Sequence, residues 1–272
     1  MPGRVIAEAT SRLRAAGVGS ARVDAELLAA FVLDVPRGRL PLVDTFPPLL
    51  KDRYEALIAR RAQRVPLQHL TGRAHFAGFD LAVGPGVFVP RPETELLAAW
   101  GLSKVQSGIG VDLCSGSGAI ALALRTRIST VYAVEQSPEA LDWLQLNTRD
   151  TDITVVHADV TDPSTLAGLD GTVDLVLTNP PYVPTTAVLE PEVADHDPHL
   201  ALFGGEDGLS VIRPLVVRAA ALLRKGGYFG MEHDDSHGES VPALLRDSGD
   251  WADITDHLDL AGRPRFVTAV RV

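Results

Sequence analysis

The chain of 272 residues is acidic, with 35 aspartate and glutamate residues against 25 lysine and arginine residues. This excess of negative charge argues against direct nucleic acid binding and against attachment to anionic membranes. The single cysteine excludes an internal disulfide, and no apolar run approaches the roughly 20 residues that cross a bilayer. The sequence therefore predicts a cytoplasmic protein, which we expect to be a monomer.

Residues 1–70 predict a small helical domain. Apolar side chains recur at helical spacing between residues 4 and 16, and Ser20 precedes a second run of this kind. We expect Val23, Leu27 and Phe31 to form one apolar stripe on the second helix. A third helix follows Pro47 and ends in three arginines that we expect to be solvated, namely Arg60, Arg61 and Arg64. The domain contains no cluster of nucleophiles or metal ligands, so we expect it to dock the substrate.

Residues 71–89 predict a β-hairpin linker. Apolar and polar residues alternate on both sides of Gly78, which is the pattern of two short strands around a turn. Two prolines then stiffen the segment that leads to Thr94, and Glu93 lies at the start of a predicted helix. This segment is either a structured linker or a lid over a substrate. In a lid, Arg91 and Glu93 would contact the substrate.

The remainder of residues 71–272 predicts a doubly wound α/β domain. Four β-branched or aliphatic runs alternate with helical segments, which is typical of parallel strands with helices on both faces. These runs span residues 109–113, 130–134, 153–157 and 173–178. After a helix expected at 209–225, further strands are expected at 228–232, 251–258 and 264–271, the last two as an antiparallel hairpin. The expected fold is a mostly parallel, seven-stranded, Rossmann-like sheet.

A glycine-rich loop follows the first of these strands. The G-x-G-x-x-A run that begins at Gly116 fits a nucleotide-binding turn, and Glu135 ends the next strand, where a carboxylate can hold ribose hydroxyls. Asp159 follows the third strand and can accept from an adenine amino group. Asp112 precedes the loop, where its charge would oppose the pyrophosphate of a dinucleotide but favour an ammonium or sulfonium group. These residues favour S-adenosylmethionine as the cofactor.

The fourth strand ends in Asn179-Pro180-Pro181-Tyr182. The two prolines prevent further ladder hydrogen bonds, so the Asn179 amide oxygen and the Pro180 carbonyl become acceptors at the carboxyl edge of the sheet. Two acceptors and an aromatic ring suit a planar NH2 group, with Tyr182 stacked on its face. On the residues alone, the same segment can equally be a rigid turn that ends a strand.

Together, several motifs resemble one enzyme family. The segments that carry the resemblance are Pro66–Gly72, Val89–Glu95, Asp112–Gly118, Asn179–Tyr182, Ala201–Leu209 and Asp259–Arg263. They are similar to the peptide chain release factor glutamine methyltransferases of the HemK/PrmC type, which are class I enzymes that use S-adenosylmethionine. The resemblance implies methylation of the glutamine in the Gly-Gly-Gln loop of bacterial class I release factors, which would be the protein partner.

The resemblance also implies a set of site residues. Those expected to line the cofactor are Cys114, Ser115, Gly116, Ser117, Gly118, Glu135, Val160 and Asn179, beside the Asp112 and Asp159 already considered. Those expected to hold the substrate glutamine and to take part in catalysis are Asn179, Pro180, Pro181 and Tyr182. The chain departs from the family pattern after Glu232, where it contains His233 and His237.

Other functions stay open on the residues alone. An adenine-N6 DNA methyltransferase uses the same tetrapeptide on a planar NH2 group, but the acidic charge and the lack of a basic recognition region disfavour it. A dinucleotide-dependent oxidoreductase leaves Asp112 and the Asn179 turn unexplained. A catalytically silent module that binds release factors is a third alternative.

Two further site types are not expected. His233 and His237 have a spacing that can suit a metal ion, but a surface loop followed by a helix start explains them as well. Cys114 is not expected to be a nucleophile, because the sequence places no histidine or lysine where it could activate the thiol.

Overall fold

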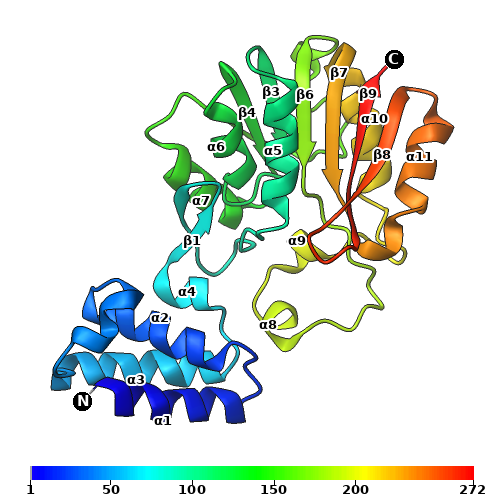
Figure 1. Ribbon diagram of the computed structural model, residues 1–272. Coiled ribbons are helices and arrows are strands. Elements are labelled where there is room, and N and C mark those ends of the chain that lie inside the picture. Colours follow the sequence, from blue (N-terminus) through cyan, green and yellow to red (C-terminus); the bar gives the residue numbers. More distant parts are fainter. Residues whose placement is uncertain (1) are drawn as a thin grey trace. The chain divides into compact units, whose positions relative to one another are not determined.

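The computed structural model describes residues 2–272 (Figure 1), and the chain divides into two compact units. One unit comprises Met1–Arg73 together with Leu189–His196, and the other comprises Ala74–Val188 and Asp197–Val272. The sequence places the whole of residues 71–272 in one domain. The structure differs in one segment, since Leu189–His196 belongs to the helical unit.

The helical unit contains the three helices expected from the sequence and several shorter ones. Its elements are α1 (Pro2–Ala15), α2 (Ala21–Leu33), the 3-10 helix η1 (Arg37–Leu42), α3 (Pro48–Ala62), α4 (Leu67–Thr71) and α8 (Pro191–Ala194). α1 ends before Gly17, whose φ of +77° favours glycine. α3 begins at Pro48, at a position where the missing N–H costs no helical hydrogen bond. Leu13, Leu28 and Ile58 are fully buried between these helices.

The buried face of α2 lies one position further along the chain than the sequence pattern suggests. Leu28 and Val32 are buried, whereas Val23 is 39% exposed. The prediction of a stripe through Val23 is therefore wrong. The actual face includes Asp24, a residue that a search for apolar periodicity passes over, because a charged side chain is rarely buried unless it is paired.

Asp24 is paired in the core of the helical unit. Its Oδ2 accepts a hydrogen bond from Arg61 Nε at 2.7 Å, and both side chains are about 95% buried. Arg61 Nη2 also donates to Glu192 Oε2 at 2.8 Å. The prediction of a solvated helix end is therefore wrong for Arg61. Its contact with Glu192 gives a physical reason why Leu189–His196 belongs to this unit.

The second unit is built on a seven-stranded sheet. Its strands are β3 (Ile109–Leu113), β4 (Thr130–Glu135), β5 (Thr154–His157), β6 (Val173–Thr178), β7 (Leu223–Glu232), β8 (Trp251–Leu258) and β9 (Pro264–Arg271). The order across the sheet is β5-β4-β3-β6-β7-β9-β8. The strands from β5 to β7 are parallel, and β9 pairs antiparallel with both β7 and β8. The predicted fold class is confirmed.

A separate two-stranded sheet precedes the main one in the chain. It consists of β1 (Arg73–Phe76) and β2 (Phe79–Ala82). Ala77 and Gly78 connect the strands with positive φ values of 47° and 88°, which is the geometry of a tight two-residue hairpin turn. The hairpin predicted around Gly78 is present.

Helices cover both faces of the main sheet (Figure 1). α5 (Thr94–Lys104), α6 (Ala119–Arg125) and α7 (Pro138–Thr148) pack on one face, and α10 (Ile212–Leu222) and α11 (Ser240–Ser248) on the other. Leu175 and Leu177 of β6 face the first group, and Val176 between them faces the second. α10 is shorter than predicted, because Leu223 already belongs to β7. None of the helices in residues 2–272 has the length and apolar character needed to cross a membrane.

The sheet order places the predicted site residues along one edge. β5, β4, β3 and β6 are parallel neighbours, so their carboxyl ends share that edge. Asp159, Glu135, the glycine loop and Asn179 follow or end these four strands in that order. The carboxyl edge of such a sheet is where ligands bind in open α/β folds.

Candidate active site

The loop between β3 and α6 forms an open turn of backbone. Cys114, Gly116 and Gly118 have positive φ values of 61°, 54° and 86°. A Cβ atom on Gly118 would lie 2.8 Å from Leu144 Cδ1, so a larger residue here would require Leu144 of α7 to shift as well as an unfavourable backbone. A Cβ atom on Gly116 would meet nothing within 4 Å. The backbone at Gly116 thus borders open space, while the Ser115 and Ser117 residues beside it are buried.

Glu135 connects this loop to the end of β4. Gly116 N donates to Glu135 Oε2 at 2.8 Å, and the other carboxylate oxygen accepts from the backbone amides of Gln136 and Ser137. The structure therefore brings together the loop and the acid that the sequence proposed as partners. Oε2 can accept one more hydrogen bond, which is the property a ribose hydroxyl needs.

Asp159 lies beside the same site. Gln136 Nε2 donates to Asp159 Oδ2 at 3.1 Å, and Oδ1 accepts from the backbone amide and hydroxyl of Thr161. The adjacent Val160 is 5% exposed and packs in the core on the face of the sheet that α10 and α11 cover. The carboxylate of Asp159 is therefore held in place at the end of β5, next to Glu135 of β4.

Asp112 is fully buried in β3. Its Oδ2 accepts from Ala121 N at 3.0 Å, which satisfies an amide in the first turn of α6, and its Oδ1 has no hydrogen-bond partner among the described residues. Burial raises the pKa of this carboxyl from 3.8 to about 8. The Asp112 side chain thus ties the end of β3 to the first turn of α6, on either side of the loop. A direct contact between Asp112 and a cofactor stays a prediction.

Asn179 directly follows β6. The strand ends at Thr178, whose hydroxyl donates to Leu113 O at 2.7 Å and so ties β6 to β3 at the beginning of the loop. Asn179 Nδ2 donates to Thr94 Oγ1 at 3.4 Å. Within residues 2–272, no group donates to Asn179 Oδ1 or to the Pro180 carbonyl. Two acceptors are therefore available to a ligand at this turn.

The last residue of the turn is held by a hydrogen bond. Tyr182 Oη donates to Glu232 Oε1 at 2.9 Å, and burial raises the pKa of the Tyr182 phenol well above its ordinary value. The ring is therefore anchored through its hydroxyl at the end of β7. The sequence had suggested stacking for this ring but no partner for its hydroxyl, because Glu232 is 50 residues away in the chain.

The segment Gly204–Gly208, called the glycine segment below, packs against the same turn. A Cβ atom on Gly204 would lie 2.7 Å from the Pro181 carbonyl oxygen, and one on Gly208 would lie 2.3 Å from that of Tyr182. Val183 N also donates to the backbone just before this segment, at Leu202 O. These glycines belong to the Ala201–Leu209 motif, for which the sequence alone suggests no structural role. The structure shows that its glycines pack directly on the Asn179–Tyr182 turn.

The segment before α5 has its own internal partners. Arg91 Nη2 donates to Asp197 Oδ2 at 2.9 Å, and its guanidinium lies over the Phe88 ring at 4.9 Å from the centroid. Asp197 is buried, whereas Asp195 and His199 in the same loop are exposed. Glu93 is half-buried at the start of α5. Substrate contacts by Arg91 and Glu93 stay predictions.

The two histidines after Glu232 support the structure. His233 is fully buried, and its Nε2 lies 2.9 Å from Asp256 Oδ1. His237 is also buried, and its Nε2 lies 3.0 Å from the Asp207 carbonyl oxygen, in the glycine segment. The surface-loop interpretation is therefore wrong for both. The described part of the chain contains no group of three or more His, Cys, Asp and Glu arranged for a metal ion.

Comparisons with known proteins identify the family. Residues 4–72 match the PrmC N-terminal domain, and residues 67–195 match the methyltransferase small domain. The chain is 52% identical to the release factor glutamine methyltransferase of Mycolicibacterium smegmatis, over 98% of this chain and 96% of that protein. The chain belongs to the release factor glutamine methyltransferase family. The Streptomyces coelicolor member is 49% identical over 97% of this chain and 96% of that protein.

A solved structure agrees with the fold of this release factor glutamine methyltransferase family member. A 16S rRNA methyltransferase of T. thermophilus, in complex with AdoMet and guanosine, superposes with a TM-score of 0.54. The match covers 74% of this chain and 50% of that chain, at 22% sequence identity. At this identity the likeness concerns the fold alone.

The protein is therefore an S-adenosylmethionine-dependent methyltransferase. The residues at the carboxyl edge fit that cofactor. Gly116 leaves open space where any other residue would place a side chain, and the carboxylates of Glu135 and Asp159 are acceptors for hydroxyl and amino hydrogens. An adenosine group carries hydrogens of both kinds.

Proposed function

We propose that this enzyme transfers a methyl group from S-adenosylmethionine to the side-chain amide nitrogen of the glutamine in the Gly-Gly-Gln loop of bacterial class I release factors. The observation that supports this best is the pair of acceptors at Asn179 and Pro180, which no described residue occupies. They follow β6, the strand beside β3 and its glycine loop. A carboxamide NH2 has two hydrogens to donate to two such acceptors.

The chemistry requires positioning more than a strong base. A carboxamide nitrogen is a weak nucleophile, because its lone pair is delocalised into the carbonyl group. When bound, S-adenosylmethionine supplies an electrophilic methyl group on a sulfonium. The substrate nitrogen would take this methyl group, the sulfur would keep the electron pair of the carbon–sulfur bond, and the nitrogen would lose a proton to solvent. Asn179 and Pro180 orient the nitrogen and stabilise the positive charge that develops on it.

The remaining site residues have supporting roles in this proposal. Pro181 stiffens the turn, and the Tyr182 ring, held by its hydrogen bond to Glu232, stacks on the amide plane. Glu135 accepts from the ribose hydroxyls, and Asp159 and Val160 border the adenine. The other residues proposed to line the cofactor are Asp112, Cys114, Ser115, Gly116, Ser117, Gly118 and Asn179.

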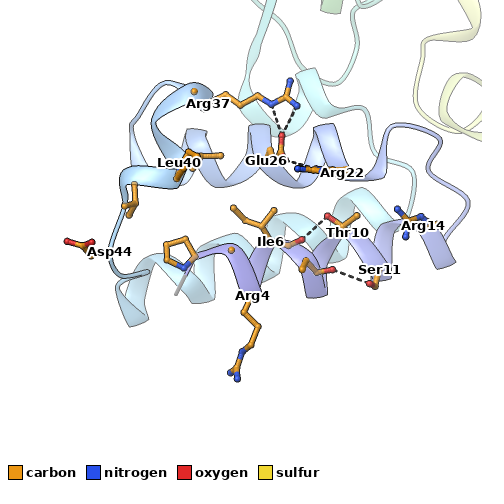
Figure 2. Close-up of a pocket in the computed structure, with 16 residues that line it drawn as sticks. Arg4, Ile6, Thr10, Ser11, Arg14, Arg22, Glu26, Arg37, Leu40 and Asp44 are labelled. Carbon is orange, nitrogen blue, oxygen red and sulfur yellow. Dashed lines mark hydrogen bonds and ion pairs between the residues drawn. The ribbon is translucent and has the colours of Figure 1, made fainter.

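The helical unit offers a surface for the rest of the substrate protein. A groove of about 1130 Å³ lies between α1, α2 and η1 (Figure 2). Glu26 in this groove is held by Arg22 at 2.9 Å and by Arg37 at 2.6 Å, whereas Arg4 extends away from α2. Arg14, in the last turn of α1, is exposed and also lines the groove. We propose that this groove contacts the folded release factor, since a flexible loop alone offers few contacts to offset its ordering.

Charge supports this assignment of the partner surface. The helical unit, with its segment Leu189–His196 included, contains 12 Lys and Arg against 10 Asp and Glu, whereas the other unit contains 13 against 25. The acidic character of the chain therefore belongs to the catalytic unit and not to the helical unit. A negatively charged patch on the substrate protein would be attracted to the groove and repelled elsewhere.

Three finer statements belong to the same proposal. A release factor substrate places the enzyme in the cytoplasm, in agreement with its single cysteine. The enzyme is proposed to act as a monomer. It is also proposed to bind no nucleic acid directly, which separates it from the adenine-N6 alternative.

A labelling experiment tests the proposal. The protein is incubated with methyl-labelled S-adenosylmethionine and one of three acceptors: a release factor, the same factor with its Gly-Gly-Gln glutamine changed to alanine, or adenine-containing DNA. Label on the unchanged factor alone is the expected result. Label on DNA would favour the adenine-N6 alternative. Cofactor binding without transfer to any acceptor would favour the silent binding module.

A further inference from the structure

A chain of three hydrogen bonds, of which the central one is buried, links the two ends of the Asn179–Tyr182 turn. Asn179 Nδ2 donates to Thr94 Oγ1 at 3.4 Å, and Thr94 Oγ1 lies 2.6 Å from Glu232 Oε2. The other carboxylate oxygen of Glu232 accepts from Tyr182 Oη at 2.9 Å. Thr94 is the first residue of α5 and Glu232 is the last residue of β7. The turn is thus tied to two elements that lie far from it in the sequence.

Burial protects the central pair of this hydrogen-bond chain, Thr94 and Glu232, from competition by water. Thr94 is 4% exposed and Glu232 is 2% exposed, so water competes little for either. In such surroundings an unpaired donor or acceptor is costly, and each group keeps the partner that satisfies it. Burial raises the pKa of the Glu232 carboxyl above its ordinary value, and the hydrogen bonds from Thr94 and Tyr182 oppose this rise only in part.

The direction in which each of these hydrogen bonds is donated determines how the Asn179 amide is oriented. The hydroxyl of Thr94 donates to Glu232 Oε2, and that of Tyr182 donates to Glu232 Oε1. Thr94 has only one hydroxyl proton and therefore can only accept from Asn179. A reversed amide would place Asn179 Oδ1 against the Thr94 oxygen, with no proton between them. The NH2 end of Asn179 consequently faces Thr94, and Oδ1 is left for the substrate.

We propose that Thr94 and Glu232 are positioning residues for methyl transfer, which set the amide orientation of Asn179 and hold the Tyr182 ring. This inference rests on the proposed function, in which Asn179 Oδ1 accepts from the substrate amide. Neither residue contacts the reacting atoms. Their effect passes through Asn179 and Tyr182, so the loss of either should lower kcat more than it changes cofactor affinity.

Paired substitutions at Thr94 test this role in the full chain. Thr94→Val keeps the shape but removes the hydroxyl, and we expect kcat to fall by about tenfold to hundredfold, the equivalent of one to two lost hydrogen bonds. Thr94→Ser keeps the hydroxyl and should retain kcat within about threefold. Thr268→Val is the matched control, because Thr268 is a buried threonine of β9 whose hydroxyl contacts His257. It should leave kcat unchanged.

A spectroscopic readout tests the same inference without substrate. In a proton–nitrogen NMR spectrum, one side-chain NH of Asn179 should be shifted and protected from exchange with water. This signature should persist in Thr94→Ser and in Thr268→Val and disappear in Thr94→Val. Calorimetry with S-adenosylmethionine should give the same affinity for all four proteins, which also shows that each one is folded.

The two readouts separate this inference from the proposed function. If the original enzyme transferred no methyl group to a release factor while the Asn179 signature followed the expected pattern, the substrate would be wrong and the amide orientation right. Unchanged kcat in Thr94→Val, or an Asn179 signature that survives there, would overturn the positioning role. A fall in kcat in Thr94→Ser equal to that in Thr94→Val would also overturn it, since both would then act through packing.

Discussion

Asn179 is the residue on which methyl transfer should depend most. Its Oδ1 is an acceptor that no described residue occupies, while its Nδ2 is held by Thr94. Asn179→Ala removes the acceptor and should lower kcat by about 100-fold or more, with cofactor affinity changed by less than about threefold. Single-turnover kinetics and calorimetry measure the two quantities separately. Near-normal turnover in the variant would contradict the role given to this amide.

Asp112 should make the stability of the enzyme depend on pH. Its pKa is about 8 in the folded protein against 3.8 when exposed, so the folded state binds the proton more tightly than the unfolded chain. Stability from this group is therefore present at low pH and is lost as the pH rises from about 4 to about 8. In Asp112→Asn, which cannot ionise, this part of the decline should disappear. Urea unfolding at several pH values checks this, and parallel curves for both proteins would refute it.

Individual roles at the site could be predicted where chemistry and spacing coincide. The pairing of Gly116 with Glu135 follows from a loop and an acid that end adjacent strands, and the structure joins them at 2.8 Å. The partners of Tyr182 and Asn179 could not be found in this way. Glu232 and Thr94 lie on other elements, and their hydrogen bonds depend on how those elements pack.

At the scale of elements, the glycine segment after α9 (His199–Leu202) should support catalysis. Gly208 has a φ of +75°, and a Cβ atom there would lie 2.3 Å from the Tyr182 carbonyl oxygen. Gly249 has a similar φ of +71° but nothing within 4 Å. Alanine at either position should cost about 1–2 kcal/mol of stability through the left-handed backbone. Only Gly208→Ala should also lower kcat, by about tenfold, because it displaces the turn. Equal activity in the two variants would mean that the turn tolerates the shift.

Helices and strands could be predicted where apolar residues recur at a regular spacing and no charged residue is buried among them. The hairpin of β8 and β9 has the bounds expected from the sequence, whereas the buried face of α2 was misplaced by one position. The reason is the buried pair of Asp24 and Arg61, since both residues count as polar in any hydropathy pattern. A buried ion pair becomes recognisable only when its two members are known to meet.

At the scale of the whole molecule, the charge of the helical unit should affect recognition of a folded substrate only. Reversing Arg4 and Arg14 to glutamate should raise KM for an intact release factor by about threefold to tenfold. The same change should leave KM for a short Gly-Gly-Gln peptide unaltered. Arg149→Glu is a matched control, because Arg149 is an exposed arginine of the catalytic unit that pairs with its neighbour Asp150. Equal effects of both reversals would point to general electrostatic attraction rather than to the groove.

The segment Leu189–His196 belongs to the helical unit, which the sequence pattern does not indicate. A helical region followed by alternating strands and helices indicates two units, and composition alone suggests where the change occurs. The assignment of Leu189–His196 to the helical unit depends on single contacts such as that of Glu192 with Arg61. Local pattern carries no information about contacts between residues so far apart in the chain.

The central claim is that the Asn179–Tyr182 turn binds a planar carboxamide. A crystal structure of the enzyme with S-adenosylhomocysteine and a peptide containing Gly-Gly-Gln tests it most directly. We expect the glutamine side-chain nitrogen to lie within hydrogen-bond distance of both Asn179 Oδ1 and the Pro180 carbonyl oxygen, with the Tyr182 ring against the amide plane. A glutamine bound elsewhere, or one whose carbonyl oxygen rather than its nitrogen faces these two acceptors, would contradict it.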